Sequence, residues 1–330
     1  METIDYDKIN EYINNIINSN TISPFFINKL DYMVKISEKY KNYVSLIYES
    51  LNKYKIKTTN LPDTKIILCL KNILSNISYN YLNMFNELLE NNLIIFIEDN
   101  IKNSCYIFDE STKNSKIIIN KHNNYSDICI LIHEFMHYVN FNKNNFSLNG
   151  YNLSEFLSIY YELYSMKYLI NKTRLSPKNF DLKTRVMNTY ECADDIINYY
   201  PLFLIYNYSK ITGNSIEHSF NDCPFKISKE MFDIMCTRLN HHIDQNKNND
   251  YKKTGKYIED TLSYILGTYL SFYSIYNLDI NDIFYISKNM SRIDVDTEKI
   301  LSNVGINLNE NFENESIDNM NRYLKELKII

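Results

Sequence analysis

Apolar residues recur at helical spacing along the first 90 residues of the chain. Four apolar positions near the start share one face of a predicted helix, namely Ile9, Ile13, Ile16 and Ile17. A serine followed by proline predicts the start of a second helix at Pro24, which continues to about Tyr54. A third helical segment runs from Pro62 to about Glu90. We therefore predict a helical N-terminal subdomain over residues 1–90.

The pattern then changes to short apolar runs. Three of them, 93–97, 105–108 and 117–119, are separated by polar residues and predict a small antiparallel sheet. Helical spacing returns from Asp127 onward. Because no repeat and no flexible linker interrupts the chain, we predict a mainly α (α+β) fold in one compact unit, with residues 91–330 as the catalytic domain.

Composition and charge narrow the class of protein. Hydrophobic residues make up 45% of the 330 residues, which excludes a disordered or fibrous chain. Lys and Arg number 35 against 40 Asp and Glu, without a basic stripe, so we do not expect a nucleic-acid partner. Asn, Ile, Lys and Tyr dominate, with 30 Tyr. Their codons are AT-rich, which indicates an AT-rich genome such as that of a large virus, an intracellular parasite or a low-GC bacterium.

Cysteines and uncharged segments indicate the cellular setting. No two of the six cysteines are closer than 13 residues, which excludes a CxxC pair and predicts buried free thiols in a reducing compartment. The N-terminal segment lacks the apolar core of a signal peptide. The longest uncharged stretch, 261–278, is broken by polar residues and is typical of a buried helix. We expect a cytoplasmic protein without a membrane partner, and the oligomeric state stays open.

The segment from His133 to His137 reads His-Glu-Phe-Met-His and matches the pattern H-E-x-x-H. Residues four apart lie on one face of a helix, so both imidazoles can reach one Zn²⁺ ion while Glu134 lies beside the metal-bound water. Asp127 is placed to cap this helix, whose other residues are largely apolar. Buried His and Glu are costly unless they are paired or bind a metal. We predict one zinc ion per chain, with Glu134 as general base and then acid.

A catalytic zinc site needs a third protein ligand, and two downstream glutamates are candidates. Glu155 and Glu162 lie seven residues apart, two turns along the same face of a predicted helix rich in apolar residues. Either carboxylate can bind the metal, and the other would then orient a ligand imidazole through its free N–H. From the residues alone, both assignments stay open.

These motifs resemble the thimet oligopeptidase / oligoendopeptidase F family of zinc peptidases. Residues 116–137 resemble that family's strand, polar turn, Asp and H-E-x-G-H helix, and residues 155–162 match its E-x-x-S-x-x-x-E helix. The resemblance implies a helical zinc-peptidase fold of the gluzincin type. It also implies Glu155 as the third zinc ligand, with Glu162 and Asp127 supporting the ligands.

The sequence departs from the family's pattern in several places. Met136 stands where the family usually has Gly, and Asn140 stands where it often has His. The loop between His137 and Glu155 is shorter than is usual in the family, and counting spacing alone would favour Glu162 as the ligand. Family members are also considerably longer, so this chain would be a reduced version.

The resemblance further implies residues that contact the substrate. A tyrosine-rich helix of the family supplies a hydroxyl to the tetrahedral intermediate, and Tyr264, three residues before a Gly, matches it. Tyr257, seven residues earlier on the same helical face, is the second choice. The predicted strand around Ile118 could pair with an extended peptide through main-chain hydrogen bonds.

We therefore predict a zinc metalloendopeptidase that hydrolyses oligopeptides or unfolded segments. One alternative is a protease specific for a single host or regulatory protein, which a peptide library would distinguish. Another is a catalytically silent binding or scaffold protein that retains the zinc fold. The intact Glu134 argues against the last hypothesis, because a silent protein does not need the base.

Overall fold

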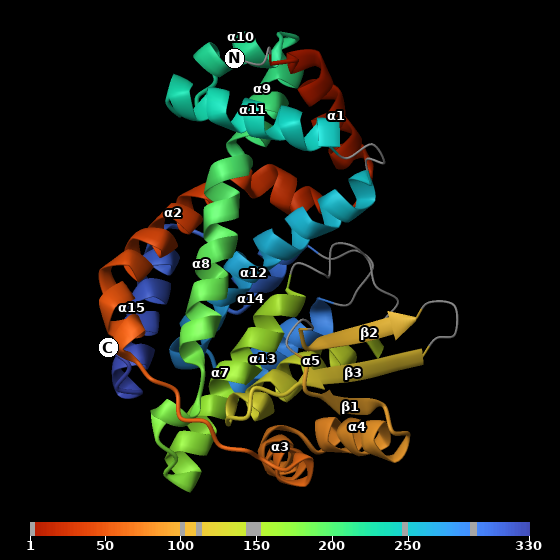
Figure 1. The fold of residues 1–330 in the computed structure, drawn as a ribbon, viewed down its shortest axis with the longest axis vertical. Coiled ribbons are helices and arrows are strands. Elements are labelled where there is room, and N and C mark those ends of the chain that lie inside the picture. Colours follow the sequence, from red (N-terminus) through yellow and green to blue (C-terminus); the bar gives the residue numbers. More distant parts are fainter. Residues whose placement is uncertain (1–3, 100–102, 110–113, 143–152, 246–249, 291–295) are drawn as a thin grey trace. The chain divides into compact units, whose positions relative to one another are not determined.

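A computed structural model describes residues 4–99, 103–109, 114–142, 153–245, 250–290 and 296–330 (Figure 1). By the packing of its residues, the chain divides into two compact units. Unit 1 comprises residues 1–44 and 188–266, and unit 2 comprises residues 45–187 and 267–330. Both units therefore join segments that are distant in sequence. The predicted division at residue 90 follows sequence order and stays a prediction.

Unit 1 is built from helices. It contains α1 (Tyr6–Asn18), α9 (Pro201–Thr212), α10 (Ile216–Asp222) and α11 (Lys229–Gln245), with the adjoining parts of α2 (Pro24–Lys53), α8 (Leu182–Tyr199) and α12 (Tyr251–Asn277). Asp5 caps α1 by accepting a hydrogen bond from the Lys8 backbone N–H at 3.0 Å. The predicted apolar face of α1 is buried at Ile9, Ile13 and Ile16.

Unit 2 holds the sheet and the remaining helices. In chain order these are α3 (Asp63–Ile77), α4 (Tyr79–Glu90), β1 (Ile94–Ile97), β2 (Cys105–Asp109), β3 (Asn114–Asn120), α5 (Ser126–Asn142), α7 (Ser154–Thr173), a 3₁₀ turn at Pro177–Asn179, α13 (Ile280–Asn289), α14 (Thr297–Asn303) and α15 (Glu310–Glu326). The predicted mainly helical fold with a small sheet is confirmed. No helix in the described ranges is both long and apolar enough to cross a membrane.

The three strands form one sheet in the order β1-β3-β2. β2 pairs antiparallel with β3, with Cys105 opposite Ile118, whereas β1 pairs parallel with β3, with Ile94 opposite Ile117. The prediction of a wholly antiparallel sheet is therefore wrong for β1 and β3. Because each connection reverses the chain direction, the first and third strands run the same way, and β3 is inserted between the two earlier strands.

The sheet and three helices, α3, α4 and α7, support α5, which carries the H-E-x-x-H motif. Ile117 and Ile119 of β3 are fully buried on the face that packs against α5. On α5, Phe135 contacts Phe85 of α4 edge to face, with ring centroids 5.4 Å apart. Among the described elements, α7 packs most extensively against α5.

A close approach of α12 to α7 fixes the first turn of α7. A Cβ at Gly267 would lie 2.8 Å from the Phe156 backbone nitrogen and 3.2 Å from the Glu155 Cβ, so only glycine fits without displacing α7. One turn later, the Ser271 hydroxyl lies 3.0 Å from the Phe156 carbonyl oxygen and 2.6 Å from that of Gly267. This contact holds the backbone that carries Glu155.

Candidate metal centre

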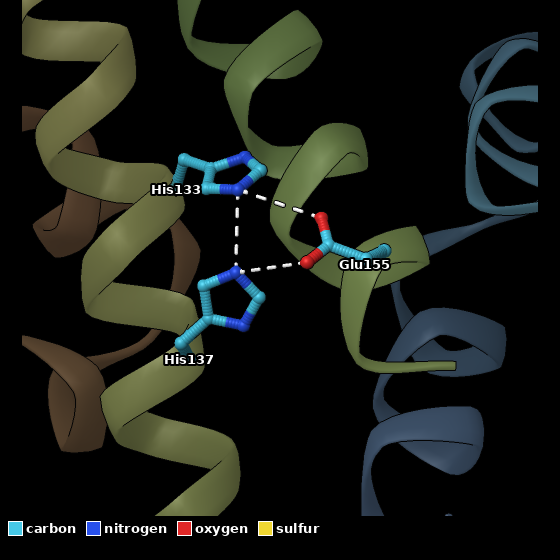
Figure 2. Close-up of side chains that lie close together, drawn as sticks. All are labelled: His133, His137 and Glu155. Atoms are coloured by element: carbon cyan, nitrogen blue, oxygen red, sulfur yellow. Dashed lines mark hydrogen bonds and ion pairs between the residues drawn. The ribbon is translucent and has the colours of Figure 1, made fainter. Parts of the chain in front are cut away.

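Three side chains from α5 and α7 converge on one point (Figure 2). His133 and His137 lie one turn apart on α5, and their Nε2 atoms are 3.2 Å apart. Glu155, in the first turn of α7, faces both rings. Its Oε2 lies 3.6 Å from His133 Nε2, and its Oε1 lies 3.4 Å from His137 Nε2. Four-residue spacing on α5 and the packing of α7 thus produce a group of three potential ligands.

The spacing of these three residues fits a zinc ion. Ligands bound to Zn²⁺ at about 2.0–2.1 Å in a tetrahedral arrangement lie roughly 3.3 Å from one another. The two imidazole nitrogens, 3.2 Å apart, match that value, and each has a different Glu155 oxygen nearby, Oε1 at 3.4 Å from His137 and Oε2 at 3.6 Å from His133. With one ligand atom taken from each residue, the three atoms lie within 4.8 Å of one another. In addition, Glu155 Oε2 is buried and has no hydrogen-bond partner among the described residues. A buried carboxylate oxygen without a partner is costly, and a cation would remove that cost.

Glu162 lies on the other side of the His133 ring. Its Oε2 is 3.2 Å from His133 Nδ1, so the tautomer with a proton on Nδ1 donates a hydrogen bond to it. That tautomer leaves Nε2 with its lone pair directed toward His137 and Glu155. The two glutamates left open by the sequence therefore occupy different positions: Glu155 at the Nε2 atoms and Glu162 at Nδ1.

Arg185, near the start of α8, pairs with Glu162. Arg185 Nε donates to Glu162 Oε1 at 3.0 Å, and Nη2 contacts Oε2 in a second, parallel interaction. The same Nη2 lies 3.1 Å from His133 Nδ1. Sequence reasoning missed Arg185, because it follows Glu162 by 23 residues in another helix. The available signal was the buried Glu162 itself, since a carboxylate on an apolar helix needs a cationic partner.

The electrostatics of the group follow from burial and from these pairs. Burial, with the neighbouring His133, lowers the pKa of His137 to about 4, so His137 is neutral at pH 7 and its Nε2 can bind a metal. Burial also raises the pKa of Glu155. Burial opposes the charge of Glu162 as well, but Arg185 and His133 outweigh it and lower its pKa. Glu162 thus contacts a guanidinium, whereas the groups within ion-pair distance of Glu155 among the described residues are the two imidazoles.

Comparison with solved structures reveals the fold. No protein-family model matches the sequence, and no curated protein matches it. Three solved structures are similar: a putative peptidase from Chlamydophila abortus (TM-score 0.54, 12% identity), Pz peptidase A with an inhibitor (0.50, 12%) and a putative oligoendopeptidase F (0.50, 10%). The chain has the fold of these peptidases. The matches cover 91–94% of this chain but only 56–58% of theirs, so the chain spans less than three fifths of their length.

Glu134 adjoins the three potential ligands within this peptidase fold. It lies on α5 next to His133, is 9% exposed, and has no hydrogen-bond or ion-pair partner among the described residues. Burial raises the pKa of the Cys105 thiol in β2, and the negative charge of Glu134 raises it further. β2 also packs against α5, the helix that carries Glu134.

Asp127 binds the backbone just before α5. Its Oδ1 accepts a hydrogen bond from the His122 N–H at 2.8 Å, and no contact with a potential metal ligand is found in the described part of the chain. The helix begins instead at Ser126, whose N–H donates to Asn124 Oδ1 at 2.7 Å. The structure thus places Asp127 in the first turn of α5, with its carboxylate bonded to the segment before the helix rather than to the imidazoles.

The predicted substrate contacts are placed as follows. Ile118 lies in β3, which is hydrogen-bonded to a strand on each side, so the expectation that this strand pairs with a peptide is wrong. Tyr257 and Tyr264 belong to α12 in unit 1, whereas the potential ligands belong to unit 2. Their contacts with a substrate stay predictions. The Tyr257 hydroxyl donates to Asp195 Oδ2 at 2.5 Å.

Proposed function

We propose that the chain is a zinc-dependent metallopeptidase that hydrolyses peptide bonds in oligopeptides or unfolded segments. The observation that carries the proposal is the convergence of His133, His137 and Glu155, with the two Nε2 atoms 3.2 Å apart and a carboxylate oxygen beside each. This convergence lies beside Glu134, within a fold that solved peptidases share. Three protein ligands leave a fourth position free for water or substrate, as catalysis requires.

In the proposed reaction, each of these side chains has its own role. His133 and His137, through Nε2, and Glu155 would hold one zinc ion, which when bound supplies Lewis-acid activation of water and of the scissile carbonyl. Glu134 takes a proton from the attacking water and later delivers it to the leaving amine. Glu162 holds the His133 ring in the tautomer that frees Nε2, and Arg185 keeps Glu162 charged.

The outer edge of β2 provides the place for an extended peptide. Among the described strands, β2 pairs on one side with β3 and has no neighbour on its other side. A peptide adding to that edge would form main-chain hydrogen bonds with a strand that packs against α5, the helix that carries Glu134. Extended binding requires an unfolded segment, which explains the proposed substrate class. Tyr264 is proposed to donate to the oxyanion, with Tyr257 as the second choice.

The experiment combines zinc content with peptide cleavage. Wild type, Glu134→Gln and the control Glu191→Gln, an exposed glutamate on α8, are purified and reconstituted with zinc. Elemental mass spectrometry should give one zinc per chain in all three. Wild type and control should cleave a quenched-fluorescent peptide library, whereas Glu134→Gln should lose at least about 10³-fold in kcat because the proton acceptor is missing.

Two results would contradict the proposal: absence of zinc from the reconstituted wild type, and cleavage by Glu134→Gln at the wild-type rate. If the library is inert but one protein is cleaved in a Glu134-dependent way, the single-target protease replaces the general oligopeptidase. If zinc binds and neither peptides nor proteins are cleaved, the chain is a zinc-binding protein without turnover.

A further inference from the structure

Unit 1 contains a cavity of about 350 Å³ that is independent of the metal centre. It lies between α1, α8, α9, α11 and α12, and its lining is largely apolar. Five of the lining side chains are buried, namely Tyr12, Ile16, Tyr200, Phe203 and Ile258. This volume falls at the lower end of the range of about 300–1,000 Å³ for ligand sites, so it suits a small group rather than a folded partner.

Two exposed aromatic rings stand at the mouth of this cavity. Tyr199 is 39% exposed and Tyr257 is 57% exposed, although both line the apolar space. Below them, Tyr12 is held by the His242 ring, edge to face with centroids 6.2 Å apart, and by Thr254 Oγ1 at 3.4 Å from its hydroxyl. The cavity therefore has a fixed aromatic wall and two rings that a ligand can cover.

The mouth also carries two charged groups with unused hydrogen-bonding capacity. Arg238 lines the cavity and has neither an ion pair nor a hydrogen bond with any described residue. Asp195 uses Oδ2 to accept from the Tyr257 hydroxyl at 2.5 Å, and no hydrogen bond to its Oδ1 is found in the described ranges. One guanidinium thus offers donors, and one carboxylate oxygen offers an acceptor, at the edge of an apolar cavity.

We propose that this cavity binds the carboxyl-terminal residue of a peptide with a large apolar side chain. The side chain enters among Tyr12, Phe203 and Ile258, and the α-carboxylate pairs with Arg238. The amide N–H of the same residue donates to Asp195 Oδ1. An α-amino acid residue presents an apolar group, an anion and an N–H donor on one carbon, which is the combination that the cavity offers.

Other ligand chemistries fit less well. A phosphate dianion would meet the Asp195 carboxylate beside a single arginine, so the charges do not match. A simple hydrocarbon would use neither the Arg238 donors nor the Asp195 Oδ1 acceptor. The proposal does not depend on hydrolysis at the metal centre, because every residue that it uses belongs to unit 1.

The test is isothermal titration calorimetry of the zinc-reconstituted full chain carrying Glu134→Gln, which prevents turnover. The probe is N-acetyl-Leu-Phe with a free carboxylate, and its carboxamide is the matched ligand control. We expect binding of the free acid to survive removal of zinc by a chelator. We expect the carboxamide to bind at least about tenfold more weakly, because it cannot pair as an anion with Arg238.

Variants locate the binding. In the Glu134→Gln background, Arg238→Gln should weaken binding of the free acid at least about tenfold. Arg238→Lys, made in the same background, should weaken it less, because the positive charge is kept. Tyr199→Ala should weaken binding severalfold, whereas Lys252→Gln, an exposed cation on α12 outside the cavity, should change it less than twofold. Unchanged melting temperatures would show that each variant is folded.

The proposal is overturned if the free acid does not bind, if Arg238→Gln binds it as the parent does, if the carboxamide binds equally well, or if the chelator abolishes binding. The last result would move the peptide to the metal centre. Conversely, failure of the proposed peptidase activity, such as a wild type without zinc, leaves the calorimetric prediction unchanged. The two proposals can therefore fail separately.

Discussion

Replacing the buried Glu259 by glutamine should remove a pH-dependent loss of stability. Glu259 is 2% exposed in unit 1, and its Oε2 accepts from the Ser23 N–H at 2.8 Å while Oε1 is buried without a partner among the described residues. Burial raises the pKa of this carboxyl from 4.5 to about 7. The folded state therefore holds a proton that the unfolded state has released between these two values.

The sign and size of the effect follow from this difference in bound protons. Because the folded pKa is raised, stability is highest below pH 4.5, falls as pH rises toward 7, and then levels off. One pKa unit corresponds to about 1.4 kcal/mol, so the loss between pH 5 and pH 8 is roughly 2 kcal/mol. Glu259→Gln keeps an oxygen for the Ser23 N–H and carries no charge, so it should avoid this loss.

Urea unfolding followed by circular dichroism at pH 5 and pH 8 measures the difference. Glu259→Gln should be close to wild type at pH 5 and more stable by roughly 2 kcal/mol at pH 8. Glu11→Gln, an exposed glutamate on α1 in the same unit, is the control and should track wild type at both pH values. An equal offset of Glu259→Gln from wild type at both pH values would refute the reasoning.

Three further substitutions probe the metal centre and its supports. Arg185→Gln should weaken zinc binding about 10–100-fold in chelator competition, because Glu162 loses its cation, whereas the exposed control Arg174→Gln should not. Gly267→Ala should destabilise the chain by about 1–3 kcal/mol and weaken zinc binding, because the new methyl group displaces the turn that carries Glu155. Tyr264→Phe should lower kcat about 10²-fold with little change in KM and with zinc content unchanged.

Each of these expectations has a clear contrary result. Wild-type zinc affinity in Arg185→Gln would show that the Arg185 pair is structural only. Full zinc affinity in Gly267→Ala would show that the first turn of α7 adjusts without moving its carboxylate. An unchanged kcat in Tyr264→Phe, measured against an exposed control such as Tyr79→Phe, would remove that hydroxyl from the proposed mechanism.

The local features of the site were predictable because they depend on spacing within one helix. Both imidazoles of H-E-x-x-H lie on the same face of α5 because the motif spans about one helical turn, whatever surrounds it. The apolar residues around the motif predicted its burial, and His133 is 8% exposed. The expected helices at Pro24 and Pro62 also depend on short-range signals, namely proline and capping residues, and α2 begins at Pro24 as predicted.

Features that depend on long-range packing were not predictable in this way. Three apolar runs specify strands but do not specify which strand is central. The strand around Ile118, which we expected to pair with a peptide, is the central one, and β2 lies at an edge of the described sheet. Arg185 reaches Glu162 from another helix, and no periodicity links the two positions. Asp127 has the residue type and position of a helix cap, yet its carboxylate turns back to the His122 N–H.

The choice between Glu155 and Glu162 shows how a long-range contact decides a local ambiguity. Seven residues span about 10.5 Å along a helix, so one face of α7 can place a carboxylate on each side of the His133 ring. Glu155 meets the atoms that also face His137, whereas Glu162 meets Nδ1 and is neutralised by Arg185. Removal of each glutamate should therefore have a different effect on zinc binding.

Glu155→Ala removes one of three potential ligands and should abolish stoichiometric zinc binding. Glu162→Ala leaves all three in place and frees the His133 ring to rotate, so zinc should still bind, about 10–100-fold more weakly. Chelator competition on the two variants separates these outcomes. Loss of zinc binding in Glu162→Ala together with retained zinc binding in Glu155→Ala would exchange the roles of the two glutamates. It would also mean that the metal binds at Nδ1 of His133, away from His137, which the geometry of α5 does not allow for a shared ion.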